Sequence, residues 1–573
     1  MYLLLEILRR RGALLCSSFF MYLNTVLVVV LSFLFTNVNC QPIIGTLFLD
    51  ESTVDDTAYT LFYPNHQTEV FLIDNCGGLV HSWQLPENSF PGSKAILDSQ
   101  GNLYVAMSNP DFVNTPTFGA GGAGGVMEQY NWDGELQWRY TIVDSLQRQH
   151  HDFELMPNGN ILALSWIRHS LEEMIEMGFD TLRHSQRSLW SDALIEFDPQ
   201  EGEVVWMWDA WDHLIQDHDS TKMNFGVVSD DLARIDVNYL DFTFGRSDWL
   251  HANSVSYSPE LDQVVISVRN FHELWVVDHS TTTQEATSSS GGKSGRGGDL
   301  LYRWGNPLAY QDTIQPKMLN FQHDASWYKD EELDITQILV YNNVYAPDTS
   351  LCHLLNPVFD KTTQRYLINE QTNSYFPATF SQTFSHPDTT KGFSAAGSSV
   401  QILDNDNILM CAARQGRIFE VTTDGELAWE YLIPFRNGFP LPQGSELNPS
   451  DNFNFEARKY PKSYIPEDAI LPEEPITLEF GDEPSYCDVA VSIEQENISD
   501  KVSIWPNPIS DKVLRFDAPL KYTDRRYRIF DTNGNLVISG QVDRNNAINL
   551  HNCKSGIFIM HIDGIPSIMF VVL

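Results

Sequence analysis

The stretch DNDNILMCAARQGRIFEVTTDGELAWEY (residues 404–431) decides the fold of this chain. A polar turn leads into a β-rich run, which is followed by an apolar run, an Asp-Gly turn and a run that contains a Trp. Asp-Gly turns set tight hairpins, and alternating aromatic and β-branched residues suit a pleated, half-buried sheet. The stretch therefore predicts consecutive β-hairpins.

The same two-part phrase recurs along the chain at unequal spacing. Its first part recurs as SQGNLYVA (99–106), PNGNILALSW (157–166), ELDQVVISVRN (260–270) and LDITQILVYNN (333–343). Its second part recurs as VFLIDNCGGLVHSW (70–83), YNWDGELQWRY (130–140), LIEFDPQEGEVVWMW (194–208) and GDLLYRWG (298–305). Repeated hairpins favour a β-propeller over a β-sandwich, because propeller blades stack face to face and cover each other's strand edges. The phrases predict an all-β fold with a six-bladed β-propeller.

Segments of different composition flank the propeller. Three arginines at 9–11 and the short apolar run that follows predict a secretion signal over residues 1–40, with a membrane anchor as the alternative. The propeller is expected over residues 41–475. A Pro-rich, acidic stretch predicts a linker over 476–502, and a separate short β pattern predicts a small C-terminal β-sandwich domain over 503–573.

The chain is strongly acidic, with 36 Lys and Arg against 76 Asp and Glu and a formal net charge of −40. Such a chain repels a phosphate backbone, so nucleic acid is not an expected partner. A small anionic substrate would require a local cationic pocket.

The cysteines beyond the signal lie far apart and lack the paired spacing of a zinc site, so they predict no metal site of their own. No cofactor is expected. An oxidising compartment would allow one long-range disulfide. The sequence does not specify the pair among Cys76, Cys352, Cys411, Cys487 and Cys553.

Two glycine-rich segments interrupt the repeat. STTTQEATSSSGGKSGRGG (280–298) predicts a flexible loop that joins two strands of one blade. GAGGAGG (119–125) lacks the Lys and the Ser or Thr that a phosphate-binding loop requires.

Three histidines hold the same position relative to the repeat. His151, His251 and His323 each precede a run of the first kind at a similar distance. If that run is the inner strand of a blade, the symmetry of the propeller brings all three imidazoles towards the central axis. Arg269 lies on the run that follows His251, and Asn253 lies two residues after that histidine. A lone histidine before a strand is most often a turn residue, but strand formation does not demand imidazole in three blades.

A cluster of imidazoles and a guanidinium permits more than one chemistry. It suits a tetrahedral oxyanion, because Arg binds two of its oxygens at once. Neutral imidazole attacks electrophilic centres to form covalent intermediates, whereas three imidazoles also bind zinc or copper. Three alternatives therefore stay open: a group-transfer enzyme, a His-liganded metallo-hydrolase, and a non-catalytic propeller for surface recognition.

Together these motifs resemble the arylsulfate sulfotransferase family. The resemblance keeps the order of the motifs over most of residues 60–435 and rests on HHDFELMPNGNILALSW (150–166), DWLHANSVSYSPELDQVVISVRNFHELWVVD (248–278), GDLLYRWGNP (298–307), FQHDASWY (321–328) and SSVQILDNDNILMCAARQGRIFEV (398–421). It implies a six-bladed propeller that moves a sulfuryl group from a phenolic sulfate ester to another phenol, without a nucleotide sulfate donor. It also implies a transient sulfohistidine.

The resemblance implies a role for each candidate residue. The family's Gln-His motif falls on His323, the implied nucleophile. Its His-x-Asn motif falls on His251 and Asn253, and its inner-strand Arg falls on Arg269. These three side chains are implied to hold the sulfuryl oxygens.

The family's His-His-acid motif falls on His150 and His151. The repeat favours His151 as the inward-facing member and implied proton donor and acceptor, with His150 as a substrate-binding neighbour. Asp324 is expected either to orient an imidazole or to cap a turn. Trp249 and Trp327 are expected either to stack on the phenol or to pack in the core. The donor, the acceptor and the oligomeric state stay open.

The C-terminal segment has a resemblance of its own. WPNPISDKVLRF (505–516), RIFDTNGNLV (528–537) and KSGIFIMHIDG (554–564) resemble the C-terminal sorting domain of the type IX secretion system, over roughly residues 503–573. This resemblance implies export through the periplasm by the type IX machinery to a secreted or cell-surface location. An ordinary small β-sandwich that binds a partner is the alternative.

Overall fold

A computed structural model gives the structure of the chain in two compact units, before and after the boundary at residues 481 and 482. It describes residues 43–111, 118, 120–239, 247–472, 475–480 and 487, and most of 503–572. The predicted signal (1–40) and most of the predicted linker (476–502) lie outside the described residues. Among the described helices, none is long and apolar enough to cross a membrane.

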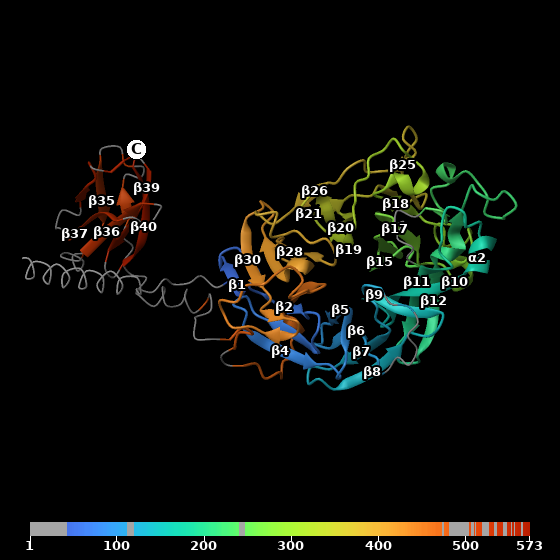
Figure 1. Ribbon diagram of the computed structural model, residues 1–573, viewed down its shortest axis with the longest axis horizontal. Coiled ribbons are helices and arrows are strands. Elements are labelled where there is room, and N and C mark those ends of the chain that lie inside the picture. Colours follow the sequence, from blue (N-terminus) through green and yellow to red (C-terminus); the bar gives the residue numbers. More distant parts are fainter. Residues whose placement is uncertain are drawn as a thin grey trace, which may run out of the picture. The chain divides into compact units, whose positions relative to one another are not determined.

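The first unit is a six-bladed β-propeller, as predicted (Figure 1). Its first three blades are β33 (Ala457–Pro461), β2 (Ala58–Phe62), β3 (Glu69–Ile73) and β4 (Leu79–Gln84); β5 (Phe90–Leu97), β6 (Leu103–Ser108), β7 (Val126–Tyr130) and β8 (Leu136–Thr141); and β9 (Gln147–Leu155), β10 (Ile161–Ser170), β11 (Ser188–Asp198) and β12 (Glu203–Asp209). The last three are β15 (Ala252–Ser258), β16 (Gln263–Val268), β17 (Glu273–Asp278) and β18 (Tyr302–Trp304); β19 (His323–Asp330), β20 (Ile335–Ala346), β21 (Thr349–Leu355) and β26 (Gln382–Phe384); and β27 (Ser399–Ile402), β28 (Ile408–Ala412), β29 (Arg417–Val421) and β30 (Leu427–Leu432), joined by β1 (Gly45–Leu49).

The short elements lie in the connections. The helical segments are α2 (Leu171–Glu176), α3 (Thr283–Ala286), η1 (Ala210–His213), η2 (Val228–Asp230), η3 (Pro307–Tyr310), η4 (Ala413–Gln415) and η5 (Lys462–Tyr464). The short strands are β13 (Leu214–Ile215), β14 (Ile235–Asp236), β22 (Phe359–Asp360), β23 (Arg365–Tyr366), β24 (Ile368–Asn369), β25 (Ser374–Tyr375), β31 (Phe435–Arg436) and β32 (Phe439–Pro440).

The inner strands are not the ones expected from the sequence. The runs at 157–166, 260–270 and 333–343 form the second strands β10, β16 and β20. The strands β9, β15 and β19, which carry or directly follow the histidines, contact one another and are therefore innermost. The physical reason is burial: the second strands are covered on both faces by neighbouring blades and are the most apolar, whereas an inner strand borders the central pore and accepts polar side chains.

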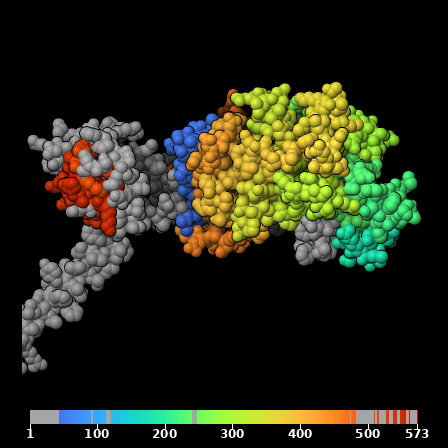
Figure 2. Space-filling model, turned by 90° about the horizontal axis from the view of Figure 1, so that it is seen from above, coloured from blue at the N-terminus to red at the C-terminus, as the bar shows by residue number. Residues whose placement is uncertain are grey.

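Both ends of the propeller segment close the ring. β33 pairs with β2, so the last strand of the unit becomes the innermost strand of the first blade. β1 pairs with β30 on the outer edge of the last blade, where the blue N-terminal segment lies against the orange blade in Figure 2. The exposed edges of the first and last blades are thereby paired, which removes two unsatisfied rows of backbone groups.

The segment 280–298 joins β17 to β18, as predicted, but the expectation of a flexible loop is wrong. It begins with a capping box in which Thr282 accepts a hydrogen bond from the Glu285 amide at the start of α3. Its end is fixed by Trp208, whose indole N–H donates to the Gly298 carbonyl over 2.7 Å. The Ser and Thr side chains therefore satisfy backbone groups rather than solvate a linker.

The second unit consists of two antiparallel sheets. Their order is β34 (Ser503–Trp505), β35 (Val513–Asp517) and β38 (Ala547–Asn549), and β37 (Leu536–Gln541), β36 (Arg526–Asp531), β39 (Gly556–Ile562) and β40 (Ile565–Val572). Leu514 and Ile548 of one sheet share a hydrophobic cluster with Ile529 and Met560 of the other. A shared core between two sheets agrees with the predicted small β-sandwich.

Two of the five cysteines beyond the predicted signal are oxidised. Cys76 and Cys487 are disulfide-bonded, whereas Cys352, Cys411 and Cys553 are buried free thiols.

Candidate active site

Backbone irregularities aim the histidines at the pore. The pairing of the inner strand with the second strand shifts register beside His151, His251 and His323 in the third, fourth and fifth blades. His151, His251 and Asp324 adopt left-handed φ angles of 50°, 53° and 55°. Bulges with such angles bend a strand and redirect its side chains. The local strand geometry, rather than the alternation of the sheet, therefore brings the three imidazoles together.

The four predicted catalytic side chains lie in one cluster. The rings of His151 and His251 are 4.6 Å apart between centroids, and Phe455 lies 5.9 Å from the His151 ring and 5.8 Å from the His323 ring. Burial lowers the pKa of His151 well below its usual value, and the nearby His251, His150, His323 and Arg269 lower it further. The guanidinium of Arg269 lies over Phe321, 4.7 Å from the ring centroid. The cluster brings one guanidinium and three imidazoles together inside this acidic chain.

The hydrogen bonds of His323 define its tautomer. Asn343 donates through Nδ2 to the carbonyls of Ser394 and Gly397, so its Oδ1 faces His323 and accepts. His323 Nδ1 lies 2.8 Å from this oxygen and 2.9 Å from the Phe321 carbonyl oxygen, and both are acceptors. Nδ1 therefore carries the proton, and the Nε2 lone pair accepts the Gly397 N–H over 3.2 Å. Burial and the nearby Arg269 lower the pKa of His323 to about 3, so this imidazole is neutral at pH 7.

His251 is backed by a carboxylate. Its Nδ1 contacts Asp248 Oδ2. The backbone of the segment around Asp248 is anchored on β11, where Trp190 N–H donates to the Ser247 carbonyl over 2.8 Å and the Trp190 carbonyl accepts the Trp249 N–H over 3.3 Å. The neighbouring third blade therefore helps to position the carboxylate beside the imidazole.

His150 and His151 point in different directions. His150 is fully buried, and its ring stacks on Trp166 at 4.0 Å between centroids. Its Nδ1 lies 2.8 Å from His151 Nδ1, and its Nε2 lies 2.9 Å from Asp192 Oδ1. His150 thus lies behind His151 rather than at the pore. The predicted substrate-binding role does not fit this position, because both ring nitrogens face protein groups.

Asn253 lies beside the cluster and ties two inner strands together. Its Nδ2 donates to the Gln322 carbonyl, the residue before His323, over 2.8 Å, and only 1% of the residue is exposed. Asn253 therefore fixes the backbone directly before His323.

Asp324 does not orient the imidazole of His323. It accepts the Val400 N–H over 2.6 Å through Oδ2 and pairs through Oδ1 with Arg458, so it joins the fifth blade to the sixth and first. Trp249 and Trp327 pack in hydrophobic clusters between blades. The core-packing interpretation of the two tryptophans is thus supported.

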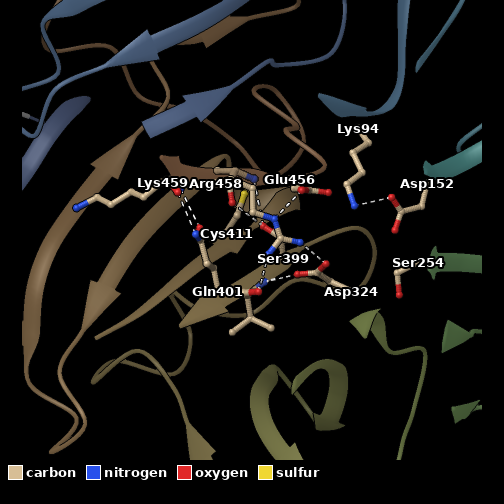
Figure 3. A network of polar contacts seen from close by, with 12 residues as sticks. Lys94, Asp152, Ser254, Asp324, Ser399, Gln401, Cys411, Glu456, Arg458 and Lys459 are labelled. Carbon is tan, nitrogen blue, oxygen red and sulfur yellow. Dashed lines mark hydrogen bonds and ion pairs between the residues drawn. The ribbon is translucent and has the colours of Figure 1, made fainter. Parts of the chain in front are cut away.

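A ring of hydrogen bonds connects the inner strands directly beside the cluster. Side-chain oxygens of Asp152, Ser254, Asp324 and Ser399 accept backbone N–H groups of the next blade, those of Val255, Ala325, Val400 and Ala457, over 2.9, 2.7, 2.6 and 3.1 Å. Figure 3 shows these four side chains together with Lys94, which pairs with Asp152 over 2.7 Å. Asp152 and Asp324 directly follow His151 and His323, and Ser254 directly follows Asn253. The ring holds the blades, and therefore the imidazoles, at fixed separations.

The glycine-rich segment 119–125 contributes to the site in a way that the sequence did not reveal. A Cβ on Gly122, whose φ is 76°, would lie 2.3 Å from the His151 ring, and one on Gly121 would lie 3.9 Å from the His251 ring. The glycines therefore allow the chain to pass directly over the imidazoles.

Replacing Gly122 with Ala should displace the His151 ring and lower the kcat/KM of any reaction at the cluster. The expected loss is about 10²-fold, the effect of a displacement of about 1 Å in a preorganised site. Gly134→Ala is the matched control, because Gly134 has a φ of 78° and nothing within 4 Å of its ideal Cβ position. Both variants pay the backbone cost of a positive φ, Gly122→Ala should lose further stability through its steric clash, and only Gly122→Ala should lose activity. Equal activities would show that the contact with His151 is unimportant.

Comparison with known proteins identifies the propeller. A family model described as arylsulfotransferase matches residues 50–428, about two thirds of the chain. The chain belongs to the arylsulfotransferase family. Membership supports aryl sulfotransferase activity in general, with phenols and sulfate esters as the substrate class. A search of curated proteins finds none that matches this arylsulfotransferase.

Solved structures similar to this arylsulfotransferase are distant. They include a protein of unknown function from Bacteroides caccae, at 10% identity, with 70% of this chain and 98% of that chain covered and a TM-score of 0.37. They also include a periplasmic gluconolactonase from Pseudomonas aeruginosa, at 10% identity, 70% and 98% coverage and a TM-score of 0.34. A virginiamycin B lyase from Staphylococcus aureus matches at 7% identity, 66% and 87% coverage and a TM-score of 0.29.

The C-terminal unit has its own match. A model described as a secretion system C-terminal sorting domain matches residues 503–567. This domain is the signal of type IX secretion, so the protein is exported to a secreted or cell-surface location.

Proposed function

We propose that this arylsulfotransferase moves a sulfuryl group from a phenolic sulfate ester to an acceptor phenol through a sulfohistidine on His323, without a nucleotide sulfate donor. The observation that carries the proposal is the tautomer of His323. A neutral imidazole with a lone pair on Nε2 is able to attack the sulfur of a sulfate ester. The guanidinium of Arg269 and two further imidazoles lie nearby and suit the negative charge of the ester.

The reaction has two balanced steps. In the first, the Nε2 lone pair of His323 attacks sulfur, the N–S bond forms, and the S–O bond to the aryl group breaks with its electron pair on the phenol oxygen. In the second, the oxygen of the acceptor phenol attacks the same sulfur, the N–S bond breaks with its electron pair on Nε2, and the proton of the acceptor passes to a base, which balances the proton taken up by the departed phenolate. Arg269 and the imidazoles of His151 and His251 stabilise the negative charge on the sulfuryl oxygens in both transition states.

The surroundings of His323 support a covalent intermediate. Because Asn343 and the Phe321 carbonyl accept the Nδ1 proton, the ring keeps its orientation when Nε2 is substituted. The Gly397 N–H, which contacts Nε2 in the resting site, is then available to a sulfuryl oxygen. Phe455 and Phe321 border the cluster and supply apolar surface for an aryl ring.

Assays with 4-nitrophenyl sulfate test the proposal. We expect release of 4-nitrophenol to require an added phenol, with formation of the corresponding aryl sulfate in equal amount. Release in water without an acceptor would indicate a sulfatase. Loss of activity with a chelator, together with stoichiometric metal in the purified protein, would indicate the metallo-hydrolase instead. Absence of release under all conditions would favour the recognition propeller.

A further inference from the structure

The imidazoles of the cluster are backed by two different kinds of acceptor. The Nδ1–H of His323 faces neutral oxygens of Asn343 and the Phe321 carbonyl. The Nδ1 of His251 faces the carboxylate of Asp248. A carboxylate stabilises an imidazolium, whereas a neutral amide oxygen does so only weakly. The two rings therefore have different chemical characters, one suited to attack and the other suited to hold a proton.

His251 is also the most accessible histidine of the cluster. Its side chain is 13% exposed, whereas His151 and His323 are each 2% exposed as residues. A group that exchanges protons with incoming and departing phenols needs such access. His151 is less suited to the task, because burial and the surrounding cationic groups disfavour its protonated form.

We propose that His251 is the general acid and base of the transfer and that Asp248 is the positioning residue that maintains it. This inference rests on the proposed function. In the first step the Nε2 proton of the His251 imidazolium passes to the departing phenol oxygen as the S–O bond breaks. In the second step the O–H proton of the acceptor passes back to Nε2 as its oxygen attacks sulfur. The enzyme returns to its initial protonation state after each turnover.

The charged and titratable groups around His251 come from its own segment and blade, from the third blade, which also contributes His150, and from the fifth blade, which contributes His323. Asp248 favours the imidazolium, and Asp192, which accepts the Ala252 N–H over 3.3 Å, adds a second carboxyl group beside it. His151 at 4.6 Å between ring centroids opposes it. Arg269, whose backbone N–H donates to the His251 carbonyl over 3.4 Å, contributes an opposing charge. Only Asp248 contacts a ring nitrogen of His251 in the described part of the chain.

The test is the dependence of the rate on the leaving group in Asp248→Asn. Phenol is a much weaker acid than 4-nitrophenol, so phenyl sulfate needs a proton on its departing oxygen and 4-nitrophenyl sulfate does not. General acid catalysis contributes about 10²-fold or more. We expect Asp248→Asn to lower kcat/KM by about 10²-fold with phenyl sulfate and by less than about 5-fold with 4-nitrophenyl sulfate.

Asp262→Asn is the matched control, because Asp262 Oδ1 also contacts a histidine, His279 Nδ1, over 3.1 Å, but outside the cluster. Its leaving-group dependence should equal that of the wild type. Asp248→Glu keeps the carboxylate and should restore part of the rate with phenyl sulfate that Asp248→Asn loses. If Asp248 had a purely structural role, Asp248→Asn would lower the rates with phenyl sulfate and 4-nitrophenyl sulfate equally.

Two results separate the inference from the function on which it rests. Equal losses with both donors in Asp248→Asn, at wild-type thermal stability, would overturn the role of His251 and Asp248 and leave the transfer reaction intact. No transfer by the wild type with either donor would overturn the proposed function itself.

Discussion

Replacing His323 with Asn should lower the rate of sulfuryl transfer from 4-nitrophenyl sulfate by at least about 10⁴-fold. The substitution removes Nε2, and the amide of Asn does not form a stable sulfuryl adduct. In the wild type, brief incubation with the donor in the absence of acceptor should add one sulfuryl group to the peptide that contains residue 323. Peptide mass spectrometry detects the adduct, which should be present in the wild type and absent from the variant. The release of 4-nitrophenol measures the transfer rate.

His353→Asn is the control for this loss. His353 is also buried, stacks on Phe380 at 3.6 Å and contacts Thr383, all outside the cluster. Its replacement should cost stability of the same order and leave the transfer rate within a few-fold of the wild type. If His323→Asn retained a tenth of the activity, or if the sulfuryl group appeared on His151 or His251, another imidazole would be the nucleophile.

The largest expected effect on stability is that of Lys459→Met. Lys459 lies in β33, and its fully buried Nζ pairs with Glu420 of β29 over 2.5 Å and donates to the Asp55 carbonyl over 3.1 Å. Removing one member of a buried pair leaves the other charge without compensation, at a cost of about 3–5 kcal/mol. Denaturant unfolding of the propeller should therefore give a free energy of unfolding lower by that amount.

A second substitution separates charge from packing. Lys462→Met, three residues further along at an exposed position, should change the free energy of unfolding by less than about 0.5 kcal/mol. Lys459→Met combined with Glu420→Gln should recover part of the loss, because the buried carboxylate is then also neutral. A double variant as unstable as Lys459→Met alone would indicate that the cost arises from lost packing over the Trp429 ring.

The repeat of turns and β-rich runs was sufficient to predict the propeller. It also showed that three histidines hold the same position in three repeats. It was not sufficient to identify the inner strand, because burial on both faces makes β16 more strand-like than β15, whose polar residues border the pore. The structure still brings the side chains of His151, His251 and His323 close together, because each lies within, directly before or at the start of an inner strand.

The partners of the histidines could not be read from the sequence. Asp248 lies three residues before His251, but its placement depends on pairing with Trp190 in another blade. Gly122 and Phe455 reach the cluster from segments 29 residues before and 304 residues after His151 in the numbering of the chain, through loops without a repeat signature. The role of Asp324 could not be predicted from the sequence for a related reason. Its partner Arg458 lies in β33, the strand that closes the ring and is far from Asp324 along the chain.

The closure of the ring by β33 determines when, during synthesis of the chain, the propeller can be completed. A growing chain that extends to residue 440 already holds every imidazole of the cluster and Arg269, yet it lacks Phe455, Arg458 and the strand that seals the first blade. Such an incomplete polypeptide should bind neither donor nor acceptor productively. The ring is therefore complete only after β33 has been synthesised, just ahead of the tail that directs the protein out of the cell.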